Sequence, residues 1–115
     1  MTNLNFNGGN PLTRRIPAVG TSHGCVLYAL CRYGRQTAQE LIYRTGYLGA
    51  QERTNELLND FYLPIQKGDL LVQMPGRETY VKTYGLNWDL ISTEYFQDFM
   101  DQAENYYGDL PINYH

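Results

Sequence analysis

The chain has 115 residues, of which 43% are hydrophobic, so it is long enough for one domain with a real core and too short for two ordinary domains. Its apolar stretches fall far short of the roughly 20 residues that span a bilayer, and its Asn- and Gly-rich start lacks a signal-peptide pattern, so we expect a cytoplasmic protein without membrane contact. The net charge of −3 is unevenly spread: residues 1–85 carry nine basic and six acidic side chains, whereas residues 86–115 carry six acidic side chains and no Lys or Arg.

Residues 1–21 predict a flexible N-terminal arm, because glycine and proline are frequent there and apolar residues are few. The adjacent Arg14 and Arg15 suit contact with phosphate. Two solvated arginines in a mobile tail are an equally simple interpretation.

The next stretch predicts two helices. From Ser22 the apolar residues follow helical spacing, and Gly34 supplies a left-handed stop. Thr37 and Glu40 then form a capping box, in which the two side chains satisfy free backbone amides at the start of a helix. This second helix is short, because Gly46 ends it.

A third helix is predicted after the turn, with an apolar stripe that runs from Ala50 to Phe61 and a polar face opposite. Pro64 ends this unit. Two strand-like runs follow, residues 69–74 and 78–84, separated by a Pro-Gly turn. They predict a β-hairpin that leans on the helices, since two strands alone are marginal in water.

The C-terminal segment predicts one more helix. Ser92 can cap it, and aromatic and apolar residues then recur every three or four positions, interleaved with acidic residues. We therefore expect a strongly amphipathic, acidic and aromatic helix with a tail over residues 87–115.

This order of elements is that of a winged helix-turn-helix. We predict an α+β, mainly α, fold in which residues 22–86 form three helices and a β-hairpin wing, followed by the additional C-terminal amphipathic helix. In such folds the third helix enters the major groove of DNA and the wing touches its backbone.

A family resemblance covers the same region. Residues 37–65, with Thr-Ala-Gln-Glu at the start, Arg53 and Glu56-Leu57 in the middle and Phe-Tyr-Leu-Pro-Ile at the end, resemble the small helix-turn-helix domains common in phage and prophage proteins. The resemblance implies a DNA-binding transcriptional regulator or recombination accessory factor, located in the host cytoplasm if phage-encoded. The chain departs from the family pattern by inserting Leu63 before Pro64, at Thr54, where an aliphatic residue is usual, and at Phe61, where glycine is usual.

Double-stranded DNA is the first predicted partner. Gln51 and Asn55 are residue types that pair with adenine and lie four apart on the third helix, although Glu52 and Glu56 on that helix would repel phosphate. A solvated polar face is the alternative. Phosphate contacts are predicted from residues of the second helix, the turn and the wing: Arg35, Thr37, Arg44, Tyr47, Arg77 and Lys82.

The C-terminal helix suggests a second kind of partner, because aromatic residues are favoured at protein interfaces. It could form a homodimer that suits a two-fold operator, close the domain's own core, or bind a host protein, as an anti-defence or host-takeover inhibitor such as an anti-CRISPR protein or a DNA mimic would. The candidate interface residues are Tyr95, Phe96, Phe99, Met100 and Tyr106.

Catalysis has little support in the sequence. There is no Gly-rich phosphate loop and no metal-ligand spacing, and His23 and His115 are the only histidines. Cys25 and Cys31 are too far apart on one helix for a disulfide and are expected to be small core residues. We therefore predict no enzyme activity, no catalytic residue, no metal and no cofactor.

Overall fold

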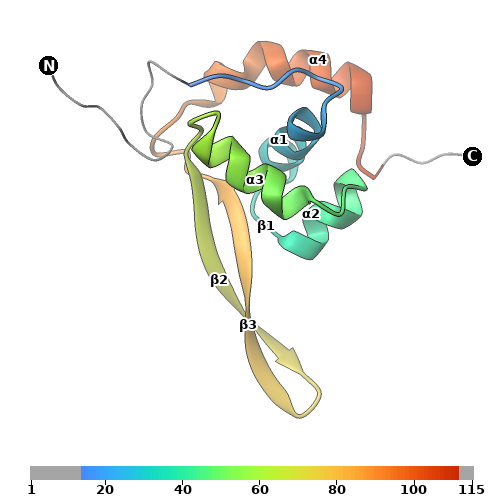
Figure 1. Cartoon of the computed structure of the whole chain (residues 1–115), viewed down its shortest axis with the longest axis vertical. Coiled ribbons are helices and arrows are strands. Elements are labelled where there is room, and N and C mark those ends of the chain that lie inside the picture. Colours follow the sequence, from blue (N-terminus) through green and yellow to red (C-terminus); the bar gives the residue numbers. More distant parts are fainter. Residues whose placement is uncertain (1–13, 112–115) are drawn as a thin grey trace, which may run out of the picture.

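The computed structural model describes residues 14–111 as an α+β domain. Four α-helices pack together at one end of the described structure, and a long β-hairpin projects from them (Figure 1). The predicted α+β class is confirmed. The elements in chain order are α1 (Ser22–Tyr33), β1 (Gln36–Thr37), α2 (Ala38–Thr45), α3 (Ala50–Asn59), β2 (Ile65–Met74), β3 (Arg77–Leu86), the 3₁₀ helix η1 (Thr93–Phe96) and α4 (Gln97–Tyr107).

Helix α1 is the centre of the core, because its residues from Gly24 to Leu30 are all buried. The side chain of Thr21 caps its start by accepting a hydrogen bond from the Gly24 amide at 3.0 Å. Gly34 ends it with a positive φ of 77°, although its ψ of −150° lies outside the left-handed helical conformation that was predicted. Helices α2, α3 and α4 pack around α1, which explains its burial on all sides.

The predicted capping box is confirmed at the start of α2. Thr37 Oγ1 accepts a hydrogen bond from the Glu40 amide at 3.1 Å, and Glu40 Oε1 accepts one from the Thr37 amide at 2.9 Å. Gly46 closes the helix in the left-handed conformation. The turn that follows leads into α3, whose buried residues Ala50, Thr54 and Leu57 face the other helices.

The sheet is antiparallel with strand order β1-β3-β2. The hairpin pairs Ile65 with Leu86 at its base and Met74 with Arg77 at its tip, so both strands are longer than predicted. Strand β1 is a two-residue bridge whose Thr37 lies opposite Thr83. This strand was not predicted, since two residues are too few to show a period.

The C-terminal helix closes the core and does not form a separate segment. The ring of Tyr107 stacks on that of Tyr28 with 5.4 Å between centroids, and the Tyr28 hydroxyl donates to the Gly108 carbonyl at 2.6 Å. Phe96 and Phe99 are both buried in the core. The prediction that these two rings line a partner interface is therefore wrong, because they already fill the space between α4 and the rest of the domain.

Residues 14–21 also pack against the domain. The Arg15 amide donates to the Phe61 carbonyl at 3.1 Å, and Ile16 packs on the core. The guanidinium groups of Arg14 and Arg15 donate to the carbonyls of Leu90 and Asp60. This part of the predicted flexible arm is thus held in place, and residues 1–13 of that arm lie outside the described residues. None of the helices in the described part of the chain is both long enough and apolar enough to cross a membrane.

Candidate interaction surface

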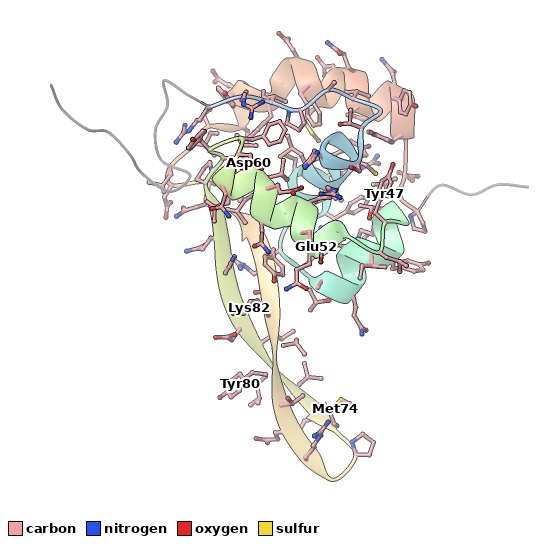
Figure 2. The ribbon with its side chains drawn as sticks, viewed as in Figure 1. Tyr47, Glu52, Asp60, Met74, Tyr80 and Lys82 are labelled. Atoms are coloured by element: carbon pink, nitrogen blue, oxygen red, sulfur yellow. The ribbon has the colours of Figure 1, made fainter. Side chains whose placement is uncertain are left out.

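Of the two residues predicted to read bases on α3, Gln51 has a hydrogen-bond partner within the domain and Asn55 is partly buried without one for its Oδ1. The Gln51 amide donates to the Tyr84 hydroxyl of β3 at 2.7 Å. Asn55 is half-buried, and its Oδ1 is shielded from solvent. The side chain that projects freely from the start of this helix is Glu52, which Figure 2 shows. A carboxylate there repels phosphate, so α3 presents a poor surface to DNA.

The predicted phosphate contacts around α2 also have internal partners. Arg35 donates to the Gln66 carbonyl, to Gln66 Oε1 and to Thr83 Oγ1 at 2.9 to 3.2 Å, which ties the chain before β1 to the hairpin. The guanidinium of Arg44 lies over the Tyr33 ring, 4.1 Å from its centroid. Thr37 is occupied by the capping box. Tyr47, in the turn between α2 and α3, remains exposed.

The unpartnered positive charge gathers on the hairpin. Within residues 14–111, four basic side chains have no hydrogen-bond or ion-pair partner: Arg44, whose guanidinium lies over the Tyr33 ring, and Lys67, Arg77 and Lys82, which all lie on β2 or β3. The predicted wing contacts Arg77 and Lys82 are therefore available for binding. Asp69 and Glu78 lie on the same two strands, so the hairpin as a whole is only weakly basic.

The outer hairpin also exposes large apolar side chains, which sequence reasoning missed. Tyr80 is 69% exposed and Leu71, directly opposite it in the ladder, is 47% exposed. Leu70 and Met74 are exposed as well. Figure 2 shows Tyr80 and Lys82 on one side of the ribbon and Met74 on the other, near the tip. The adjacent Leu70 and Leu71 in a strand were the available signal, since residues in sequence on a strand point to opposite faces.

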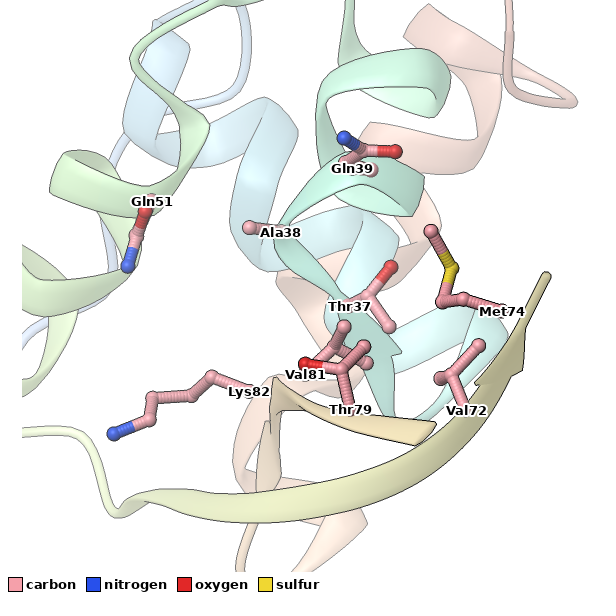
Figure 3. A pocket seen from close by; sticks show the side chains of 9 residues that line it. All are labelled: Thr37, Ala38, Gln39, Gln51, Val72, Met74, Thr79, Val81 and Lys82. Atoms are coloured by element: carbon pink, nitrogen blue, oxygen red, sulfur yellow. The ribbon is translucent and has the colours of Figure 1, made fainter. Parts of the chain in front are cut away.

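A groove of about 560 Å³ lies between the outer hairpin and the start of α2. Figure 3 shows Thr37, Ala38 and Gln39 on the helix side of this groove and Val72 and Val81 on the strand side. Most of the lining is apolar, and Lys82 supplies the one full charge among the lining residues. An extended chain segment with small apolar side chains would suit such a groove.

Comparison with known proteins returned no match. No protein-family model, curated protein or solved structure matches this chain.

The remaining candidates lie on η1 and α4 and form a mixed surface. Tyr95 and Tyr106 are exposed, whereas Met100 is partly buried against the core. Around the two tyrosines the exposed side chains are mainly acidic or amide, and Gln97 donates to Asp101 at 3.0 Å. The exposed rings of Tyr95 and Tyr106 thus lie on a surface that is otherwise mainly acidic and amide.

Titratable groups with shifted pKa values include a carboxylate bonded to neighbouring helix residues and two thiols in helix α1. His23 of α1 bonds to Glu56 of α3 at 2.8 Å, and Arg53 pairs with the same carboxylate. These contacts, that from His23 first, lower the pKa of Glu56. Burial raises the pKa of the thiol to about 11 for Cys25 and about 12 for Cys31. Among the described residues no three His, Cys, Asp or Glu side chains are grouped to hold a metal ion.

Proposed function

We propose that this chain is a winged helix-turn-helix domain whose function is to bind another protein through its outer hairpin, residues 69–82. The order α1-β1-α2-α3-β2-β3, with a capped second helix and a glycine turn before the third, supports the winged-helix part of the proposal. The fold alone does not name the partner. The choice of a protein partner depends on the surface that the fold displays.

The observation that carries the proposal is the exposed apolar hairpin. Leu70, Leu71, Met74 and Tyr80 project into solvent from a ribbon that extends beyond the helices (Figures 1 and 2). A two-stranded ribbon is marginal in water, and this one exposes apolar side chains on both faces, Leu71 and Tyr80 on one and Leu70 and Met74 on the other, which costs solubility unless a partner covers them. Aromatic and methionine side chains of this kind are enriched at the centres of protein interfaces.

The geometry suits strand addition as the mode of binding. An extended peptide can add to the free edge of a sheet, where backbone hydrogen bonds supply affinity and pockets for alternate side chains supply specificity. The groove between the hairpin and the start of α2 provides apolar surface from Ala38, Val72 and Val81. A phage protein of this kind would be an inhibitor of a host protein or of host defence, which is the second function that the sequence predicted.

The experiment is affinity capture with matched surface variants. The full chain, a Leu71→Asp/Tyr80→Asp variant and a Tyr43→Asp control are immobilised, and retained host proteins are identified and then tested in purified form. Tyr43 on α2 is the control because its ring is as exposed as that of Tyr80 and lies outside the hairpin. The proposal predicts a purified partner that binds the native chain and the control but not the hairpin variant. A partner that still binds the hairpin variant would refute it.

Duplex DNA is the second candidate, favoured by the topology and by the position of the unpartnered cations. Lys67, Arg77 and Lys82 lie along the hairpin, which projects away from the acidic helix α4 (Figure 1). A wing with three cations can touch the backbone of DNA. Replacing Gln51 and Asn55 with alanine should then abolish sequence preference in a binding titration, whereas the protein-binding proposal predicts no change from these substitutions.

A further inference from the structure

The segment that follows the hairpin exposes three large aromatic rings. Trp88, Tyr95 and Tyr106 are each at least 40% exposed. The rings of Trp88 and Tyr95 pack edge-to-face on the buried ring of Phe96, with 5.9 and 5.2 Å between centroids. Tyr106 packs in a similar way on Tyr107, which helps to close the core. The three exposed rings are therefore held by their neighbours and keep part of their surface in solvent.

Exposed carboxylates form a row beside these rings. They recur every three or four residues along η1 and α4: Glu94, Asp98, Asp101 and Glu104. Residues at this spacing share one side of a helix, and at a rise of about 1.5 Å per residue the row is roughly 15 Å long. Tyr95 and Tyr106 are about three helical turns apart, so both flank the same side of the row. We call the surface formed by the row and the three rings the acidic face.

The charge of the acidic face is not neutralised within residues 14–111, because none of the four carboxylates has an ion-pair partner there. Two arginines contact the C-terminal segment, but Arg14 donates to the Leu90 carbonyl and Arg32 pairs with Asp109. The row also disfavours its own helix, since like charges at this spacing repel one another. Glu104 lies in the last turn, where the helix dipole favours a cation and no basic residue is present. A positively charged partner would relieve this repulsion.

We propose that the acidic face is a docking surface for an arginine-rich segment of another protein. Charge complementarity selects a cationic occupant, because the unpartnered carboxylates attract it and repel both nucleic acid and an anionic membrane. The rings select arginine within that class. A guanidinium stacks on aromatic faces, best on that of tryptophan, whereas the lysine ammonium is more strongly hydrated. This surface is separate from the hairpin, so the inference goes beyond the proposed function (Figure 1).

A second copy of this chain is a poor occupant. The unpartnered cations of the hairpin are interspersed with Asp69 and Glu78, and Asp69 lies directly opposite Lys82 in the ladder. The hairpin therefore presents no run of arginines to the acidic face. The net charge of −3 also makes two copies repel one another. The partner is thus a different, basic protein.

Trp88 is the only tryptophan of the chain, so its fluorescence reports directly on the acidic face. The native full chain is titrated, at physiological ionic strength, with two synthetic peptides of equal length and charge, one built on arginine and one on lysine. Neither peptide contains an aromatic residue. The arginine peptide should give a saturable change in Trp88 emission, with a Kd about fivefold or more below that of the lysine peptide, because its guanidinium groups stack on the rings.

Charge-neutral variants locate the binding on the acidic face. Asp98→Asn/Asp101→Asn should raise the Kd of the arginine peptide about fivefold or more, because half of the row loses its charge. The matched control Asp69→Asn/Glu78→Gln removes the same charge from the hairpin and should leave the Kd nearly unchanged. Far-UV circular dichroism checks that both variants are folded.

Three results would overturn the proposal: no saturable change in Trp88 emission, equal Kd values for the two peptides, or an equal loss of affinity in the hairpin control. The last two would mean that the net charge of the chain alone attracts cations. The Leu71→Asp/Tyr80→Asp variant of the capture experiment should bind the arginine peptide like the native chain. Failure of the acidic face and failure of the hairpin as a binding surface are therefore distinguishable.

Discussion

Replacing Phe99 with alanine should destabilise the domain itself. The ring is 6% exposed and lies in the core formed by α4 and α1. Truncating a buried phenylalanine costs about 3–5 kcal/mol, since apolar contacts are lost and a cavity remains. Domains are stable by about 5–15 kcal/mol, so about a fifth or more of the stability is at stake. With a urea m-value of about 1–3 kcal/mol per molar, the unfolding midpoint should fall by about 2 M.

Urea unfolding followed by far-UV circular dichroism measures this change. Tyr106→Ala is the matched control, because its ring lies on the same helix and is 64% exposed. A surface substitution of this kind should change the free energy of unfolding by less than about 1 kcal/mol. The reasoning is refuted if Phe99→Ala leaves the midpoint unchanged and instead dissociates an oligomer, since that is the behaviour of an interface residue.

Three further predictions concern pH, packing and thiol chemistry. The bond from His23 lowers the pKa of Glu56, so this bond stabilises the fold above the ordinary pKa of a carboxylate. The contribution disappears as pH falls through the lowered pKa. Acid unfolding of Glu56→Gln should therefore lack this component. A Cβ added at Gly24 would lie 2.2 Å from the Ala18 carbonyl oxygen, so Gly24→Ala should lower stability by about 1–3 kcal/mol, or more, in the same urea assay. Burial raises the pKa of both thiols, that of Cys31 to about 12, so a thiol reagent at pH 8 should label the native chain far more slowly than the chain in urea.

Local signals predicted most of the fold. The capping box at Thr37 and the glycines at 34 and 46 act within a few residues, so the pattern shows them directly. The short strand β1 could not be predicted, because its existence depends on the distant partner Thr83. The extension of the hairpin to residues 65 and 86 depends in the same way on pairing between strands.

The site was less predictable than the fold, because a helical period shows which residues share a face but not what covers that face. Phe96 and Phe99 have the spacing of an interface stripe and also that of a core stripe, and packing against α1 decides between them. Gln51 looks free in the sequence, since nothing there indicates the Tyr84 hydroxyl beside it. The solvent exposure of the apolar outer hairpin could not be predicted, because apolar residues in strands are ordinarily covered by helices.

The most direct test of the central claim, that the hairpin binds protein and α3 does not read DNA, is a fluorescence anisotropy titration of a mixed-sequence duplex at low salt. The proposed function predicts no saturable binding by the full chain, because α3 presents Glu52 and most arginines are held within the domain. The contradicting result is saturable binding that weakens steeply as salt rises, with a log-log slope that reports several phosphate contacts.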